Sequence, residues 1–265
     1  MKTWIIRGAT LLGALVFGWV LYVLLEPLGY AWVVWTLGCF VVGFFVTELV
    51  LRTRKRSGER ADWARWKAAL LDPPARRRAI GELRRAQERA RRLGPRLVIR
   101  QARVAVALAE LELADGKSDA AIRTLSKVDV SLLDPLQAVI VRVARAQAYL
   151  HGGDVDGAAA TLIPLEGETT GDAVLDASLA LARGAVALEE GRVDEASAAA
   201  ASIVEAAEPH DELWDEAKAL EAACLAASAE PHAPSLEAIH DVGRRRLAAL
   251  GSARVRALIE AMSQP

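Results

Sequence analysis

The sequence has few side chains of the kinds that bind metals or form cross-links. Its 265 residues include two cysteines and four histidines. Cys39 lies in an apolar run and Cys224 in an alanine-rich segment, and their spacing fits neither a disulfide framework nor a thiolate metal site. The histidines are His151, His210, His232 and His240. None stands four residues from another histidine or cysteine, the spacing that places two ligands on one helical face. We therefore expect no metal and no cofactor.

Motifs of common enzyme classes are also missing. The chain has no Gly-x-Ser-x-Gly elbow, no phosphate-binding P-loop and no dinucleotide glycine fingerprint. The stretch GDVDG at 153–157 has the aspartate spacing that begins a calcium loop, but alanine and leucine occupy the later ligand positions. The sequence therefore predicts that the protein is not an enzyme. An enzyme whose active site has no recognisable motif stays open as an alternative.

Apolar residues, by contrast, are concentrated near the start of the chain. Residues 8–25 carry no charge, and residues 31–51 carry only Glu48. Each run is long enough to cross about 30 Å of hydrocarbon as a helix. The link EPLGY between them contains Pro27 and Gly29, which end helices. Residues 1–51 are therefore predicted to form a two-helix transmembrane hairpin. A cleaved signal peptide is the weaker alternative, because a second apolar run follows at once.

Lysine and arginine predict how this hairpin is oriented. Lys2 and Arg7 precede the first span, the short link has no basic residue, and RTRKR at 52–56 follows the second span. Basic residues are retained on the cytoplasmic side of membranes. We therefore expect both termini in the cytoplasm and the chain in a bacterial inner (plasma) membrane.

A strongly basic segment, residues 52–96, follows the predicted spans. Residues 52–103 carry 18 Lys and Arg against 5 Asp and Glu, a balance of +13. Trp63, Trp66 and Leu70 fall on one helical face with cations around them, a pattern typical of a membrane interface. The predicted lipid-interface residues are Arg54, Lys55, Arg56, Trp63, Trp66 and Lys67. Anionic lipid is the favoured partner and nucleic acid the less favoured alternative, because the segment begins where the membrane ends.

A hexapeptide pattern, Gly-x-x-Asp-x-Ala, occurs three times in the rest of the chain, as GKSDAA, GDVDGA and GRVDEA. Its residues are Gly116, Asp119 and Ala121; Gly153, Asp156 and Ala158; and Gly191, Asp194 and Ala196. Glycine suits a left-handed helix end, aspartate the positive end of the next helix, and alanine a close helix crossing. The pattern predicts an all-α solenoid of antiparallel helix pairs over residues 97–265, closed by one capping helix at about 235–261.

These features resemble the tetratricopeptide repeat, which also has a turn glycine, a small residue in its first helix and an alanine in its second. Tyr149, four residues before its glycine, matches as well. The resemblance implies a protein-binding groove lined by first-helix residues. They are Val106, Glu110, Leu113, Val143, Gln147, Leu150, Leu181, Ala185 and Leu188. The family's Lys and Asn clamp for peptide carboxylates is absent, so an apolar helix or peptide is the expected ligand. Filling of the groove by the C-terminal helix is the alternative.

The order of two spans, the link EPLGY, a basic segment and helical repeats is similar to the N-terminal region of the HemY family, which is linked to haem biosynthesis. This chain has a shorter link and fewer repeats than that family. The sequence as a whole predicts a membrane-anchored scaffold or adaptor that recruits protein partners at the cytoplasmic face. A HemY-like role and a self-assembling structural protein of the envelope are the alternatives, and a homo-oligomer is compatible with each.

Overall fold

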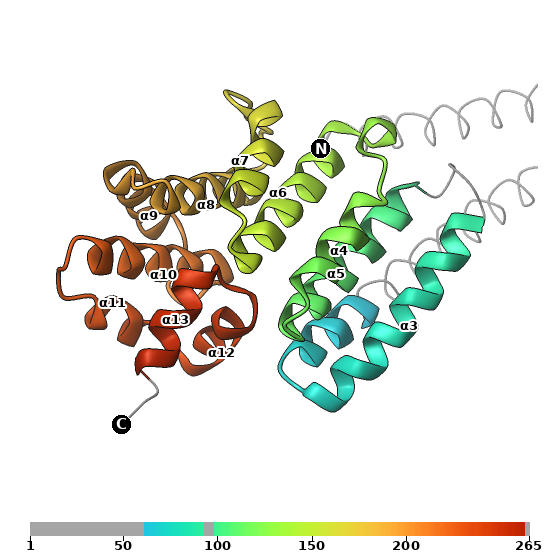
Figure 1. Cartoon of the computed structure of the whole chain (residues 1–265), viewed down its shortest axis with the longest axis horizontal. Helices are drawn as coiled ribbons and strands as arrows, with labels where there is room; N and C mark the ends of the chain where they lie inside the picture. Colours follow the sequence, from blue (N-terminus) through green and yellow to red (C-terminus); the bar gives the residue numbers. More distant parts are fainter. Residues whose placement is uncertain (1–60, 93–97, 263–265) are drawn as a thin grey trace, which may run out of the picture. The chain divides into compact units, whose positions relative to one another are not determined.

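The computed structural model describes residues 61–92 and 98–262, and their regular secondary structure is entirely helical (Figure 1). Residues 61–70 form a first short helix. The helices that follow are α3 (Pro73–Arg92), α4 (Val98–Ala114), α5 (Ser118–Ser126), α6 (Pro135–Gly152), α7 (Val155–Leu162), α8 (Ala173–Glu189), α9 (Val193–Ala206), α10 (Glu212–Ala227), α11 (Ala233–Ala238), α12 (Asp241–Leu250) and α13 (Ala253–Met262), with 3-10 turns η3 (Val130–Leu132) and η4 (Ile163–Leu165). The all-α class is therefore confirmed for this part of the chain.

The three repeated glycines form the corners between paired helices. Gly116, Gly153 and Gly191 have φ values of 74°, 81° and 82°. Each donates its N–H to the carbonyl three residues earlier, and the following residue donates to the carbonyl five residues before itself. This pair of bonds ends a helix at a left-handed residue. The alanines of the pattern, Ala121, Ala158 and Ala196, have 0% exposure where the helices cross.

A fourth corner has the same geometry without a glycine. Ala229 stands 38 residues after Gly191 and has a φ of 57°. Its N–H donates to Ala226, and Glu230 donates to Leu225, as at the other corners. The pair α10 and α11 is therefore a fourth repeat of the same design, and its second helix has only six residues.

Aspartates begin the first helix of each later pair. The side chains of Asp134, Asp172 and Asp211 cap α6, α8 and α10 by accepting backbone N–H bonds from the first turn. Arginines on the same helices satisfy the carbonyls that end the preceding pair. Arg145 donates to Leu125 and Val128, and Arg183 donates to Leu165. The aspartates thus cap their own helices, and the arginines of α6 and α8 join these helices to the pair before each.

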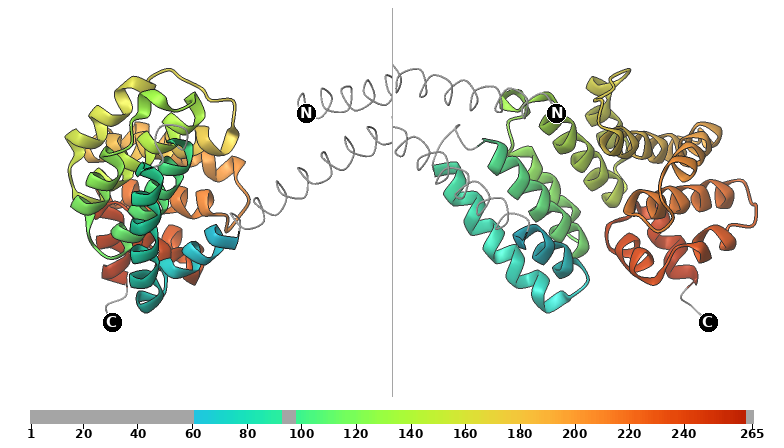
Figure 2. Two further views of the ribbon diagram at one scale, coloured as in Figure 1. Left: turned by 90° about the vertical axis from the view of Figure 1, so that its right-hand side faces the viewer. Right: turned by 180° about the vertical axis from the view of Figure 1, so that it is seen from behind.

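The described part of the basic segment packs against the repeats. Leu70, Ile80 and Leu83 are buried in one cluster with Leu108 and Leu111 of α4. The views in Figure 2 show α3 beside α4, as the contacts between them require. The residues from Trp63 to the C-terminus form a single compact unit. The domain boundary expected at residues 96 and 97 lies outside the described residues.

The C-terminal region differs from the single helix expected at 235–261. It forms three helices, α11, α12 and α13, because the chain is extended at Ile239 and His240 and again at Gly251. Ser252 then accepts a hydrogen bond from the N–H of Val255 at the start of α13. These breaks let the region fold back, so that α12 packs on α4 and α10 while α13 packs on α6 and α10.

No helix within the described ranges has both the length and the apolar character needed to cross a membrane. The predicted spans, residues 8–25 and 31–51, lie outside these ranges.

Candidate functional site

The nine residues predicted to line a groove lie within the helix stack. Glu110, Gln147 and Ala185 are half-buried, and Val106, Leu113, Val143, Leu150, Leu181 and Leu188 are buried. Leu181 and Leu188 share a core cluster with Leu247 of α12 and Val255 of α13. Leu250 packs against the cluster that contains Val106 and Leu113. The C-terminal helices thus pack against the clusters that contain Leu181, Leu188, Val106 and Leu113, whereas the cluster of Val143 and Leu150 contains no residue from these helices.

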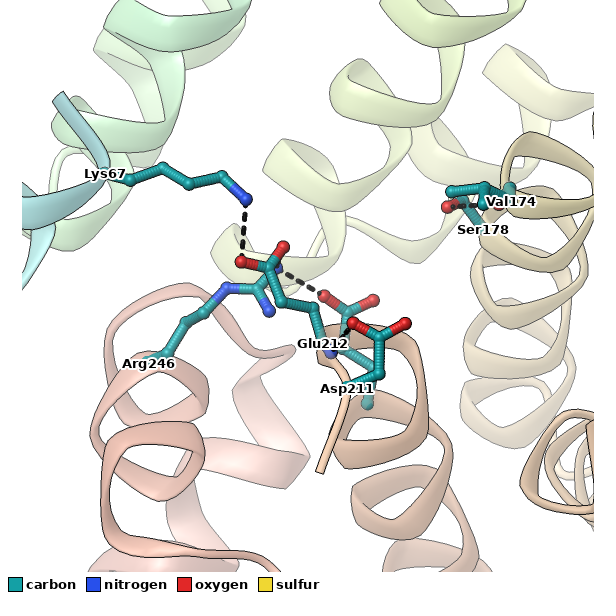
Figure 3. A network of polar contacts seen from close by, with 7 residues as sticks. Lys67, Val174, Ser178, Asp211, Glu212 and Arg246 are labelled. Carbon is teal, nitrogen blue, oxygen red and sulfur yellow. Dashed lines mark hydrogen bonds and ion pairs between the residues drawn. The ribbon is translucent and has the colours of Figure 1, made fainter. Parts of the chain in front are cut away.

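A charged cluster joins the first helix, α4, α10 and α12. The Nζ of Lys67 donates to Oε1 of Glu212 at 2.7 Å. The guanidinium of Arg246 lies 3.3 Å from Oε2 of Glu212 and 3.0 Å from Oε1 of Glu216. Figure 3 shows Lys67 and Arg246 converging on the Glu212 carboxylate. Glu110 of α4 is the third acidic member, and it interacts electrostatically with both cations.

The cluster has one more carboxylate than it has cations, and the pKa values reflect this excess. Burial raises the pKa of Glu110 to about 7, although Arg246 and Lys67 oppose the shift. Burial also raises the pKa of Glu216. At Glu212 burial acts in the same direction, but the bond from Lys67 and the charge of Arg246 together lower its pKa. Near neutral pH the cluster therefore holds a proton at Glu110 in part of the molecules.

A shallow hollow lies beside Glu110. It is lined by Trp63, Trp66, Lys67, Leu70, Ala107, Glu110 and Leu111. The two tryptophan rings meet edge to face, with centroids 6.2 Å apart. The Nε1 of Trp66 is buried and has no hydrogen-bond partner among the described residues. Both rings are half-buried against the α3–α4 core, and Leu70 is fully within it.

This packing changes how the predicted lipid-interface residues are interpreted. Arg54, Lys55 and Arg56 lie outside the described residues. Trp63 and Trp66 present only part of their surface to solvent, and Lys67 is paired with Glu212. Further exposed cations of this segment lie on α3, which has eight arginines and two glutamates. Its exposed arginines Arg78, Arg85, Arg89 and Arg92 recur at i, i+7, i+11 and i+14, a spacing that places them on one helical face.

A buried histidine ties the second corner to the C-terminal helices. The Nε2 of His151 lies 3.2 Å from the carbonyl of Ala249, so it carries the proton and donates. Its Nδ1 then accepts from the hydroxyl of Ser118 at 2.8 Å. Arg256 donates to the carbonyl of His151 at 2.6 Å. Burial and the charge of Arg256 lower the pKa of His151, which favours the neutral ring that these bonds require.

No family model, curated protein or solved structure matches this chain. Its site must therefore be interpreted from its own residues.

Sequence reasoning identified Glu110 and Lys67 but did not bring them together. It missed Glu212, Glu216 and Arg246, which complete the cluster. A signal was present, because Glu212 and Glu216 stand four residues apart and so share one face of α10. The partner on α12 depends on the break at His240, and no periodicity in the sequence predicts where a broken helix folds back.

Proposed function

We propose that this chain is a membrane-anchored, tetratricopeptide-like scaffold that recruits protein partners at the cytoplasmic face of a bacterial inner membrane. The stack of antiparallel helix pairs supports a binding role, because such stacks present long surfaces on a rigid frame. Because the C-terminal helices pack against part of the expected groove, we assign the partner surface to the edge of the stack.

Exposed apolar side chains at this edge are the observation that carries the proposal. Four of them lie in the connections between successive pairs or in the helical turns that follow. They are Leu132 in η3, Leu136 in α6, Ile163 in η4 and Val174 in α8. Ile163 is 59% exposed and Val174 63% exposed. Apolar side chains that recur along an edge favour a protein contact over chance exposure.

Site-specific photo-crosslinking in cells tests this assignment. A photoreactive residue at Val174 of the full chain should yield a crosslinked band with another protein. The same residue at Ala201, exposed on α9 away from the connections, should not. A band composed of two copies of this chain would favour the self-assembling structural alternative. Equal crosslinking at the two positions would refute a partner surface at the edge.

We also propose that the arginine face of α3 contacts anionic lipid. Each cation near an anionic leaflet contributes about 1 kcal/mol of attraction, which salt weakens. A protein of residues 63–265 should bind vesicles that contain phosphatidylglycerol and release from them as salt rises. The double variant Arg78→Gln with Arg85→Gln should bind at least about tenfold more weakly.

A matched variant distinguishes the effect of the arginine face on vesicle binding from the effect of net charge. Arg123→Gln with Arg245→Gln removes the same charge from exposed positions on α5 and α12 and should bind vesicles as the parent does. Equal losses of vesicle affinity in the two double variants would show that overall charge, and not the arginine face, determines binding. Tight binding to DNA or RNA without a preference for anionic lipid would favour the nucleic-acid alternative.

A further inference from the structure

Two histidines and an aspartate that are far apart in the sequence meet at the junction of α9, α10 and α12. His210 lies in the connection before α10, Asp215 in the first turn of α10, and His240 at the residue before α12. One ligand atom from each lies within 4.8 Å of the other two. The Nδ1 of His240 is 3.4 Å from Oδ2 of Asp215, and the two imidazole rings have centroids 5.5 Å apart.

The aspartate at the centre of this group is buried without full hydrogen bonding. Its side chain is 4% exposed, and its Oδ1 has no hydrogen-bond partner among the described residues. A buried carboxylate oxygen in this state is costly unless another group compensates it. Gly243 of α12 leaves the space that Asp215 occupies, because a Cβ there would lie 2.0 Å from Oδ2.

The backbone conformation of His210 also places its ring near Asp215 and His240. His210 has a φ of 69°, a left-handed conformation that is unusual for a residue with a Cβ. Its ring lies edge to face against Trp214, with centroids 5.3 Å apart. A strained residue is retained where surrounding contacts fix it, and such residues gather at binding sites.

We propose that His210, Asp215 and His240 bind one divalent transition-metal ion, for which Zn²⁺ is the best-fitting candidate. Two imidazoles and one carboxylate form a donor set that Zn²⁺ accepts, and water completes the tetrahedron. Ligand atoms around tetrahedral zinc are separated by about 3.4 Å. The 3.4 Å between His240 and Asp215 already meets this requirement. His210 is exposed, so its ring has room to approach by rotation.

The ion would link three parts of the chain, two of which, α10 and α12, are also joined by the ion pairs of Arg246 with Glu212 and Glu216. It would fasten the connection before α10 and the start of α12 to the first turn of α10. Coordination through Oδ2 would compensate the charge of the buried Asp215 carboxylate. Because the site exists only in the folded chain, binding would stabilise the native state.

Metal titration of the full chain in detergent tests the proposal. After removal of metal with a chelator, Zn²⁺ is added in competition with a chelating indicator at neutral pH. We expect one equivalent to bind and the melting temperature to rise. Co²⁺ should give the intense visible absorption of a tetrahedral site. His210→Ala and His240→Ala should each weaken Zn²⁺ binding by more than about 100-fold, since loss of mere outer-shell partners costs about 10–100-fold.

His232→Ala is the matched control, because His232 is another solvent-accessible histidine, in the connection between α10 and α11, and it is not part of the group. It should bind Zn²⁺ as the parent does. His210 and His240 are exposed, so their variants should keep the parent's circular dichroism. The proposal is overturned if the parent binds no Zn²⁺. It is also overturned if all three histidine variants bind alike, which would indicate adventitious binding.

Discussion

At the scale of single residues, Glu110 gives the protein a measurable dependence on pH. Its pKa is about 7 in the folded chain, against 4.5 for an ordinary glutamate. Between these values the folded state holds a proton that the unfolded state releases. The associated stability is therefore complete below about pH 4.5 and is lost as pH rises through about 7. Glu212, Glu216, Lys67 and Arg246 face this carboxyl from the neighbouring helices.

Glu110→Gln should remove this dependence. The variant should resemble the parent near pH 5 and be more stable by about 1–3 kcal/mol near pH 8, because glutamine carries no charge to bury. Urea unfolding at the two pH values, with a chelator present, measures the difference. Glu205→Gln, exposed on α9, is the control and should leave the parent's pH profile unchanged. A parent-like profile in Glu110→Gln would show that Glu110 ionises normally.

Ala229 provides a second test at the scale of one residue. It holds a left-handed conformation, with φ of 57°, at a corner where the three earlier repeats have glycine. This conformation costs a residue with a Cβ about 1 kcal/mol. Ala229→Gly should therefore raise the free energy of unfolding by up to about 1 kcal/mol, whereas Gly191→Ala should lower it by a similar amount. Equal effects of the two changes would contradict the shared corner geometry.

At the scale of helices, the packing of α12 on α10 depends on Gly243. A Cβ at this position would lie 2.0 Å from Oδ2 of Asp215 and 2.9 Å from the Cγ2 of Ile239. Gly243→Ala should therefore destabilise the protein by about 1–3 kcal/mol, the usual cost of overpacking.

Gly81 of α3 is the matched helical glycine, because a Cβ there would meet nothing within 4 Å. Gly81→Ala should stabilise the protein by about 0.5–1 kcal/mol, since alanine loses less entropy in a helix. Thermal unfolding of both variants measures the contrast. If Gly243→Ala were as stable as Gly81→Ala, the close approach of α12 to Asp215 would not exist in solution.

How far the sequence predicts this fold depends on whether local or distant contacts decide each element. The corners at Gly116, Gly153 and Gly191 could be predicted, because a left-handed helix end has a local chemical requirement. The corner at Ala229 could not, since alanine carries no such signal and tertiary packing imposes the conformation. The meeting of His210 with His240 also escaped prediction, because it depends on where the chain folds back.

At the scale of the whole molecule, the C-terminal helices are needed to complete the core. Leu236, Ile239 and Leu247 belong to the same buried cluster as Leu181 and Leu188. A chain ending at residue 232 would lack Leu236, Ile239 and Leu247 and would expose Leu181 and Leu188 to water. We expect it to bind a hydrophobic dye and to lose the cooperative thermal transition of the parent.

Removal of residues 263–265 alone serves as the control for that truncation and should leave the transition unchanged. A cooperative, parent-like transition in the chain ending at 232 would mean that α4 to α10 form a complete core without the C-terminal helices.

The packing of α12 on α4 also determines when the protein can finish folding as it is made. α4 ends at Ala114, and α12 begins at Asp241. Ribosomes add about 5–20 residues per second, so α4 waits roughly 6–25 s for its partner to be synthesised. During that interval the leucines of the unfinished core are open to chaperones and to neighbouring nascent chains. The time needed to reach and complete α12 therefore determines how long each new molecule remains vulnerable to aggregation.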